Sequence, residues 1–207
     1  MPVPAPWLRR VFVLAWMVTA APPAFADITP ALVGQLRQGG FVIVMRHASS
    51  PTAAPSAQDA DPGNTKLERQ LDGEGKQSAI AMGKAIKALH IPIGKVFSSP
   101  AFRAMETVRL AGFAAATPED ALGDQGQSMA QLNGPGPAAW LQRAVSEPPP
   151  AGSNILIVTH LPNITAAFPK EAQGLKDGES IIFRPGKSAA IAAHAAIGDW
   201  PLAADGK

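Results

Sequence analysis

The sequence contains no cysteine. This absence excludes disulfide bonds, thiol nucleophiles, and zinc or iron–sulfur sites built on thiolate ligands. A protein without disulfide bonds must rely on its hydrophobic core for stability. A chain of 207 residues has enough material for one domain with a substantial core.

The chain also lacks a membrane-spanning run at its apolar N-terminus. The apolar segment 11–21 has eleven residues, whereas a transmembrane helix needs about 20. Arg9 and Arg10 precede it and Ala24-Phe25-Ala26 follows, which is the pattern of a secretory signal peptide. We therefore predict a signal peptide over 1–26, cleaved near Ala26/Asp27, and a single periplasmic or secreted domain over 27–207. An uncleaved membrane anchor is the alternative.

An excess of one charge is absent as well. The predicted signal peptide holds two of the 18 Lys and Arg residues and none of the 16 Asp and Glu residues, which leaves 16 of each sign. A balanced charge gives no support for a nucleic-acid partner or for a membrane surface as partner. It indicates no particular oligomeric state.

Strand-like and helix-like segments alternate along the rest of the chain. Apolar runs predict strands over 41–45, 94–99, 154–159, 180–184 and 188–196. Helical spacing and end signals predict helices over 28–39, 73–90, 100–112, 138–146 and 162–168. We expect Asp72 to cap the second helix and Ser99, followed by Pro100, to cap the third. This alternation is typical of an α/β layered fold with a largely parallel sheet.

Segment 48–70 is rich in Ala, Ser, Pro and Asp and has no periodicity. It predicts a long loop, of a length that in compact domains often binds a ligand or closes over a site.

Three predicted strands end in residues that suit phosphate chemistry. These ends are Arg46-His47, Ser98-Ser99 with Arg103 just beyond, and Thr159-His160. The carboxyl ends of parallel strands meet at one edge of a sheet, where α/β proteins bind ligands. We therefore expect the three ends to converge on one site.

Arg103 supports this interpretation because it falls in the first turn of a predicted helix. A cation near the positive end of the helix dipole is unfavourable unless an anion is also present. Helix N-termini supply free N–H groups that bind phosphate. The alternative is a structural ion pair with Glu106, three residues further on. We favour the phosphate site.

Four motifs occur in order along the chain and together resemble the histidine phosphatase superfamily, which has the phosphoglycerate mutase-like fold. The resemblance covers about 41–168, and weakly extends to Trp200. Its motifs are Arg46-His47, Leu71-Asp72-x-x-Gly75-x-Gln77-x-Ala79, Ser98-Ser99-Pro100-x-x-Arg103-Ala104-x-Glu106-Thr107 and Val158-Thr159-His160.

The resemblance implies a three-layer α/β/α sandwich and a phosphohistidine mechanism. His47 would be the nucleophile, while Arg46, Arg103 and His160 would hold the phosphoryl oxygens of a small phosphorylated substrate. Ser99 and Asn163 are further candidates for the substrate pocket. Two guanidinium groups can bind phosphate through charge-assisted contacts, so neither a metal nor another cofactor is expected.

The sequence lacks an obvious proton donor for the leaving group. Mutase-like members carry a Glu after the second arginine, but region 128–136 has no acidic residue. Asp124 and Glu179 are the remaining candidates. Without a donor, a phosphoramidate or an anhydride would suit the site, since such leaving groups need less acid assistance. A phosphatase is the leading hypothesis, a non-catalytic phospholigand-binding module is the first alternative, and a phosphoglycerate mutase-type enzyme is the second.

Overall fold

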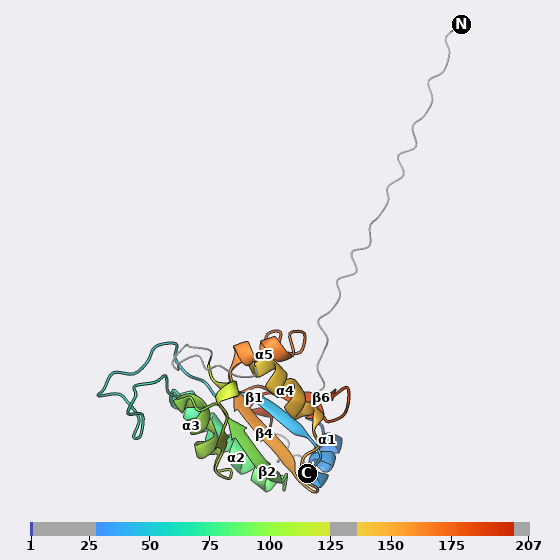
Figure 1. Cartoon of the computed structure of the whole chain (residues 1–207), viewed down its shortest axis with the longest axis horizontal. Coiled ribbons are helices and arrows are strands. Elements are labelled where there is room, and N and C mark those ends of the chain that lie inside the picture. The colour runs from blue at the N-terminus through green and yellow to red at the C-terminus, as the bar shows by residue number, and fades with distance from the viewer. Residues whose placement is uncertain (2–27, 125–135, 201–207) are drawn as a thin grey trace.

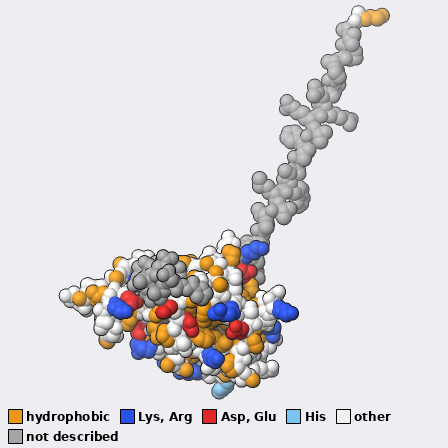
Figure 2. Space-filling view, in the orientation of Figure 1, with side chains coloured by type: hydrophobic (Ala, Val, Ile, Leu, Met, Phe, Trp, Pro, Cys, Tyr) orange, Lys and Arg blue, Asp and Glu red, His pale blue; other side chains and the backbone are white. Residues whose placement is uncertain are grey.

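The computed structural model describes Met1, residues 28–124 and residues 136–200. These ranges leave out nearly all of the predicted signal peptide. They also leave out residues 128–135, most of the region in which we looked for an acidic proton donor. Within them, no helix is both long and apolar enough to cross a membrane. Figure 2 shows positive and negative side chains interspersed over the visible face of the domain.

The described strands form one six-stranded, mostly parallel sheet in the order β3-β2-β4-β1-β5-β6 (Figure 1). Strands β3, β2, β4 and β1 run parallel, whereas β5 is antiparallel to both β1 and β6. This confirms the predicted, largely parallel sheet, to which β3 adds a short strand that was not predicted. The strands are β1 Val42–Arg46, β2 Ile93–Ser98, β3 Thr117–Pro118, β4 Asn154–Thr159, β5 Ser180–Arg184 and β6 Ala190–Ala195.

Helices cover both faces of the sheet and make the predicted three-layer sandwich. Ile43 and Met45 of β1 pack with α1 (Pro30–Gln38), α2 (Gly73–Ala88) and α3 (Phe102–Ala111) on one face. Val42 and Val44 pack with α4 (Pro137–Ser146) and α5 (Leu161–Ala167) on the other. The alternation of side chains along a strand produces these two cores from one apolar run.

The start of α2 is fastened to the chain just after His47. As predicted, Asp72 caps the helix, accepting a hydrogen bond from Gly75 N over 2.7 Å. Its other carboxylate oxygen accepts from Ser49 Oγ over 2.6 Å. A Cβ atom on Gly75 would lie 2.2 Å from Ser49 O, so only glycine permits this close approach. The second motif therefore positions the segment that follows the first.

The predicted cap of α3 is wrong. The helix begins at Phe102 after Ala101, which offers no side-chain cap. Phe102 N instead donates to the carboxylate of Glu68, at the end of the long loop, over 2.8 Å. The Ser99 hydroxyl lies too early for this role, and it accepts a hydrogen bond from Ala101 N over 3.1 Å. In Figure 1 the long loop extends away from the sheet on the side of α3.

Candidate active site

His47 follows β1 at the carboxyl edge of the sheet and is buried, with 3% of its surface exposed. Its Nδ1 lies 2.8 Å from the carbonyl oxygen of Ala48. Because that oxygen can only accept, Nδ1 carries the proton and Nε2 keeps its lone pair. Burial, assisted by the positive charges of Arg103, Arg46 and Arg69, lowers the pKa of His47 to about 3, against the opposing effect of the Ala48 hydrogen bond. The ring is therefore neutral near pH 7, as a nucleophile must be.

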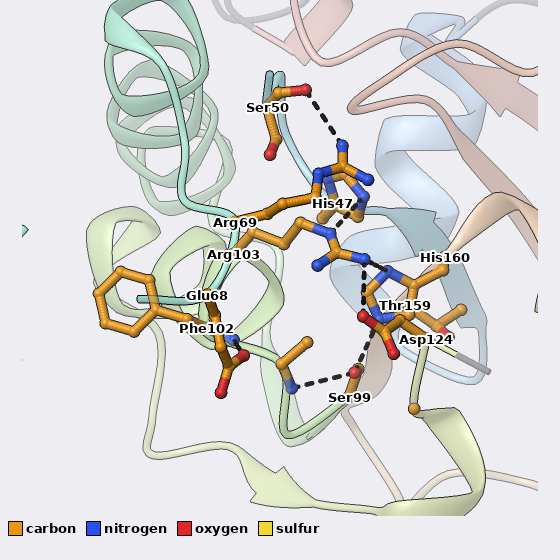
Figure 3. A network of polar contacts seen from close by, with 12 residues as sticks. His47, Ser50, Glu68, Arg69, Ser99, Phe102, Arg103, Asp124, Thr159 and His160 are labelled. Atoms are coloured by element: carbon orange, nitrogen blue, oxygen red, sulfur yellow. Dashed lines mark hydrogen bonds and ion pairs between the residues drawn. The ribbon is translucent and has the colours of Figure 1, made fainter. Parts of the chain in front are cut away.

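Arg103 lies at the centre of the site and is fully buried (Figure 3). Its Nε donates to Nε2 of His47 over 3.2 Å, and its Nη2 donates to Nδ1 of His160 over 3.1 Å. Its Nη2 also pairs with Asp124 Oδ2 at 3.3 Å. Burial lowers the pKa of Arg103, and Asp124 opposes this shift. The ion pair that we considered with Glu106 does not form, since Glu106 pairs with Arg109.

His160 follows β4 and completes the centre of the site. Because Arg103 donates to its Nδ1, its proton lies on Nε2, which donates to Ser99 Oγ over 2.8 Å. Burial, together with the charge of Arg103, lowers its pKa to about 2. Ser99 therefore fixes the orientation of the His160 ring. The three predicted strand ends converge on one site, as expected.

Arg46 lies beside the site, but it bonds to two residues of the α5–β5 connection. Its Nη1 donates to Leu175 O over 3.0 Å, and its Nη2 pairs with Asp177 Oδ1 at 2.6 Å. Its charge nevertheless contributes to lowering the pKa values of His47 and His160. Arg46 thus adds to the positive field of the site while a carboxylate outside it holds the guanidinium.

Asn163, which we expect to line the substrate pocket, also has a structural role. It is fully buried, and its Nδ2 lies 2.9 and 2.7 Å from the carbonyl oxygens of Leu122 and Gly123, and 2.9 Å from Thr159 Oγ1. These contacts fasten the turn before Asp124 to the end of β4. Asn163 thereby helps to place Asp124 next to Arg103.

The two proton-donor candidates have different positions. Asp124 is buried within the site, beside Arg103. Glu179 Oε2 instead accepts from Lys176 N over 2.8 Å, and Glu179 lines a separate cavity with His194 and Asp199. No contact within the described part of the chain joins the Glu179 carboxylate to His47, Arg103 or His160. Asp124 is the better candidate.

Two residues near His47 had no predicted role, although one of them, Thr107, belongs to the third motif. Thr107 Oγ1 accepts from Ala48 N over 3.2 Å and donates to Arg103 O over 2.8 Å, so one hydroxyl links the chain around both residues. Arg69 reaches the site from the long loop and appears beside His47 in Figure 3. A sequence signal for it existed, because Arg69 is a cation two positions before the second motif, near the end of a predicted binding loop.

Comparisons with known proteins reveal similarity at the level of structure. No family model and no curated protein matches the chain. The protein histidine phosphatase SixA complexed with tungstate is 21% identical, with a TM-score of 0.53, over 76% of this chain and 97% of SixA. A phosphoserine phosphatase mutant from Entamoeba histolytica in complex with phosphoserine is 15% identical, with a TM-score of 0.51, over 77% of this chain and 98% of that protein. The chain therefore shares the phosphoglycerate mutase-like fold of these two proteins.

Proposed function

We propose that this protein is an exported phosphatase that hydrolyses small phosphorylated substrates through a phosphohistidine formed on His47. One observation carries the proposal: a buried neutral histidine, with its lone pair on Nε2, faces a buried arginine that also contacts a second histidine. The tungstate complex of SixA and the phosphoserine complex of the Entamoeba enzyme support an oxyanion or phosphorylated ligand for this fold.

In the first step, Nε2 of His47 attacks phosphorus as the bond to the leaving oxygen breaks. Arg103 now donates to Nε2, so it must turn its N–H groups to the phosphoryl oxygens before attack. The ring becomes cationic when the P–N bond forms, and the Ala48 carbonyl oxygen stabilises its Nδ1–H. Arg46 and Arg103 offset the negative charge of the phosphoryl group.

In the second step, water attacks phosphorus and gives a proton to the Asp124 carboxylate, the P–N bond breaks with its electron pair returning to Nε2 of His47, and inorganic phosphate leaves. The leaving oxygen of the first step needs a proton when the substrate is an alkyl ester. Asp124 is the donor that we propose, because its carboxyl group lies beside Arg103 and His160. It would act in its protonated form, after the phosphoryl oxygens replace its carboxylate as the partner of Arg103. General acid assistance of this kind contributes about 10²- to 10⁴-fold in rate. Phosphoramidates and anhydrides depend on it less.

The decisive experiment combines turnover with trapping of the intermediate. Purified protein would be incubated with p-nitrophenyl phosphate and a panel of phosphoesters, with and without a chelator, and then quenched rapidly. We expect hydrolysis that persists with chelator and an acid-labile, base-stable phosphoprotein that is lost in His47→Ala. Absence of turnover in the native protein, or full activity in His47→Ala, would refute the proposal.

Two further measurements, of melting temperature and of phosphoryl exchange, separate the two alternatives. A binding module on this fold predicts that phosphate raises the melting temperature while hydrolysis remains at background. A mutase predicts phosphoryl exchange between two positions of a sugar acid. We rank the mutase last, because an exported enzyme would rarely meet such a metabolite.

Export is tested on the precursor. Expression of the full chain in a bacterial host, followed by fractionation and N-terminal sequencing, should yield a periplasmic protein that begins near Asp27. Retention of residues 1–26 on a membrane-bound protein would support the anchor instead.

A further inference from the structure

Arg69 reaches the site from the long loop, a different element from those that carry the other arginines. Figure 3 shows its side chain next to His47 and Arg103. Its charge contributes to lowering the pKa values of His47, Arg103 and His160. A residue of the predicted binding loop therefore acts electrostatically on three residues at the centre of the site.

Hydrogen bonds fix the guanidinium of Arg69 against the first residues of its own loop. Nε donates to the carbonyl oxygen of Pro51 over 2.7 Å, and Nη2 lies 3.3 Å from that of Ser50. Ser50 Oγ in turn donates to Gln70 O over 2.8 Å. These hydrogen bonds join the two ends of the loop, and the Arg69 side chain lies next to His47.

The residue before Arg69 is clamped by a buried asparagine. Asn64 Oδ1 accepts from Glu68 N over 2.9 Å, and Asn64 Nδ2 donates to Glu68 O over 2.8 Å. Leu67, between them, has a φ of 51°, which a leucine rarely adopts. Because the Glu68 carboxylate also caps α3, this clamp ties the loop to the helix that carries Arg103.

We propose that Arg69 is a third phosphate-binding arginine, which makes the 48–70 loop part of the substrate site. Asp177 and Asp124 pair with Arg46 and Arg103, yet all three arginine charges still act on His47. A phosphate in this positive field would gain charge-assisted contacts. The clamp holds Arg69 in place before binding, so little conformational freedom is lost on binding. The inference rests on the proposed function, since it assumes that phosphate occupies the pocket beside His47.

Titration calorimetry with inorganic phosphate at fixed ionic strength tests the inference on the native chain, Arg69→Gln and Arg69→Lys. We expect Arg69→Gln to bind phosphate about tenfold more weakly, equal to about 1.4 kcal/mol. Arg69→Lys should fall between the two, because lysine keeps the charge but loses the planar fork. Arg109→Gln is the matched control, since Arg109 pairs with Glu106, and it should bind as the native protein does.

Two further readouts separate this role from a purely structural one. Without phosphate, the melting temperature of both Arg69 variants should stay close to the native value, while the rise caused by phosphate shrinks. In turnover assays, KM should rise more than kcat falls.

If both Arg69 variants bind phosphate as tightly as the native protein, the inference is overturned and the phosphatase proposal stands. If the native protein binds phosphate without hydrolysing any substrate, the phosphatase proposal fails, and the binding series still decides the role of Arg69.

Discussion

The proton on Nδ1 of His47 is directed at the carbonyl oxygen of Ala48, 2.8 Å away, and this leaves the lone pair of Nε2 in the buried site. The Arg46-His47 motif indicates a nucleophile but does not say which ring nitrogen carries the proton. The carbonyl oxygen of Ala48 decides this, and Thr107 Oγ1 accepts a hydrogen bond from the N–H of Ala48. A side chain at position 48 has no part in this contact.

The two buried histidines should make stability depend on pH. Burial lowers the pKa of His47 to about 3 and that of His160 to about 2, from an ordinary value near 6.5. Between these limits the unfolded chain binds more protons than the folded chain, so stability is complete above about pH 6.5 and falls with decreasing pH. Each histidine should contribute a loss of about 2 kcal/mol between pH 7 and pH 5.

Urea unfolding of the phosphate-free protein at pH 7, 6 and 5 measures this loss. In His47→Gln and in His160→Gln, the decrease between pH 7 and pH 5 should be smaller than in the native protein by about 2 kcal/mol. An identical decrease in all three proteins would show that neither histidine is held neutral by the fold.

Asp124→Asn should affect substrates according to their leaving groups. The amide keeps the size of the side chain but cannot supply the proton that an alkyl leaving group needs. We expect kcat to fall by about 10² or more for an alkyl phosphate, and by less than about tenfold for p-nitrophenyl phosphate or a phosphoramidate. Equal losses on all substrates would instead identify Asp124 as a positioning residue for Arg103, with which it pairs. Glu179→Gln is the matched carboxylate control and should change neither rate.

The sheet and the convergence of three strand ends on one site followed from the sequence because they depend on local patterns. The run Val42–Met45 alternates between two cores, and His47 and His160 each follow directly after a strand. The contacts that tune the site depend instead on long-range geometry. Glu68 caps α3 from 34 positions away, and Ser99 bonds to a residue 61 positions distant. No local pattern predicts such pairs.

The same limit explains the wrong helix cap and the unforeseen contacts of Asn163. Ser99 before Pro100 has the composition of a helix cap, but the chain turns once more before α3 begins, and the hydroxyl is used by His160. Asn163 was predicted beside the substrate because it follows His160 closely. In the structure the first turn of α5 directs its amide at the carbonyl oxygens of Leu122 and Gly123.

Asn163 offers a test of this structural role. Asn163→Ala removes a buried donor from two main-chain carbonyl groups and should lower the free energy of unfolding by about 1–3 kcal/mol. Asn163→Asp should be more destabilising, because a carboxylate oxygen would face these carbonyl oxygens and be repelled. Urea unfolding at pH 7 compares the three proteins. A stable Asn163→Ala variant with a raised KM would restore the substrate-binding role.

Asp177 should affect substrate binding because it fixes the position of the Arg46 guanidinium. The ion pair at 2.6 Å and the bond to Leu175 O fix the Arg46 fork from the side of the α5–β5 connection. Asp177→Ala removes one of these two anchors, so we expect KM to rise several-fold, by up to about tenfold, with a smaller change in kcat. Asp177→Asn keeps an acceptor oxygen and should show a smaller rise. Glu179→Gln, two positions away, controls for the loss of charge in this connection, and tighter phosphate binding by Asp177→Ala would show that Asp177 competes with the substrate for Arg46.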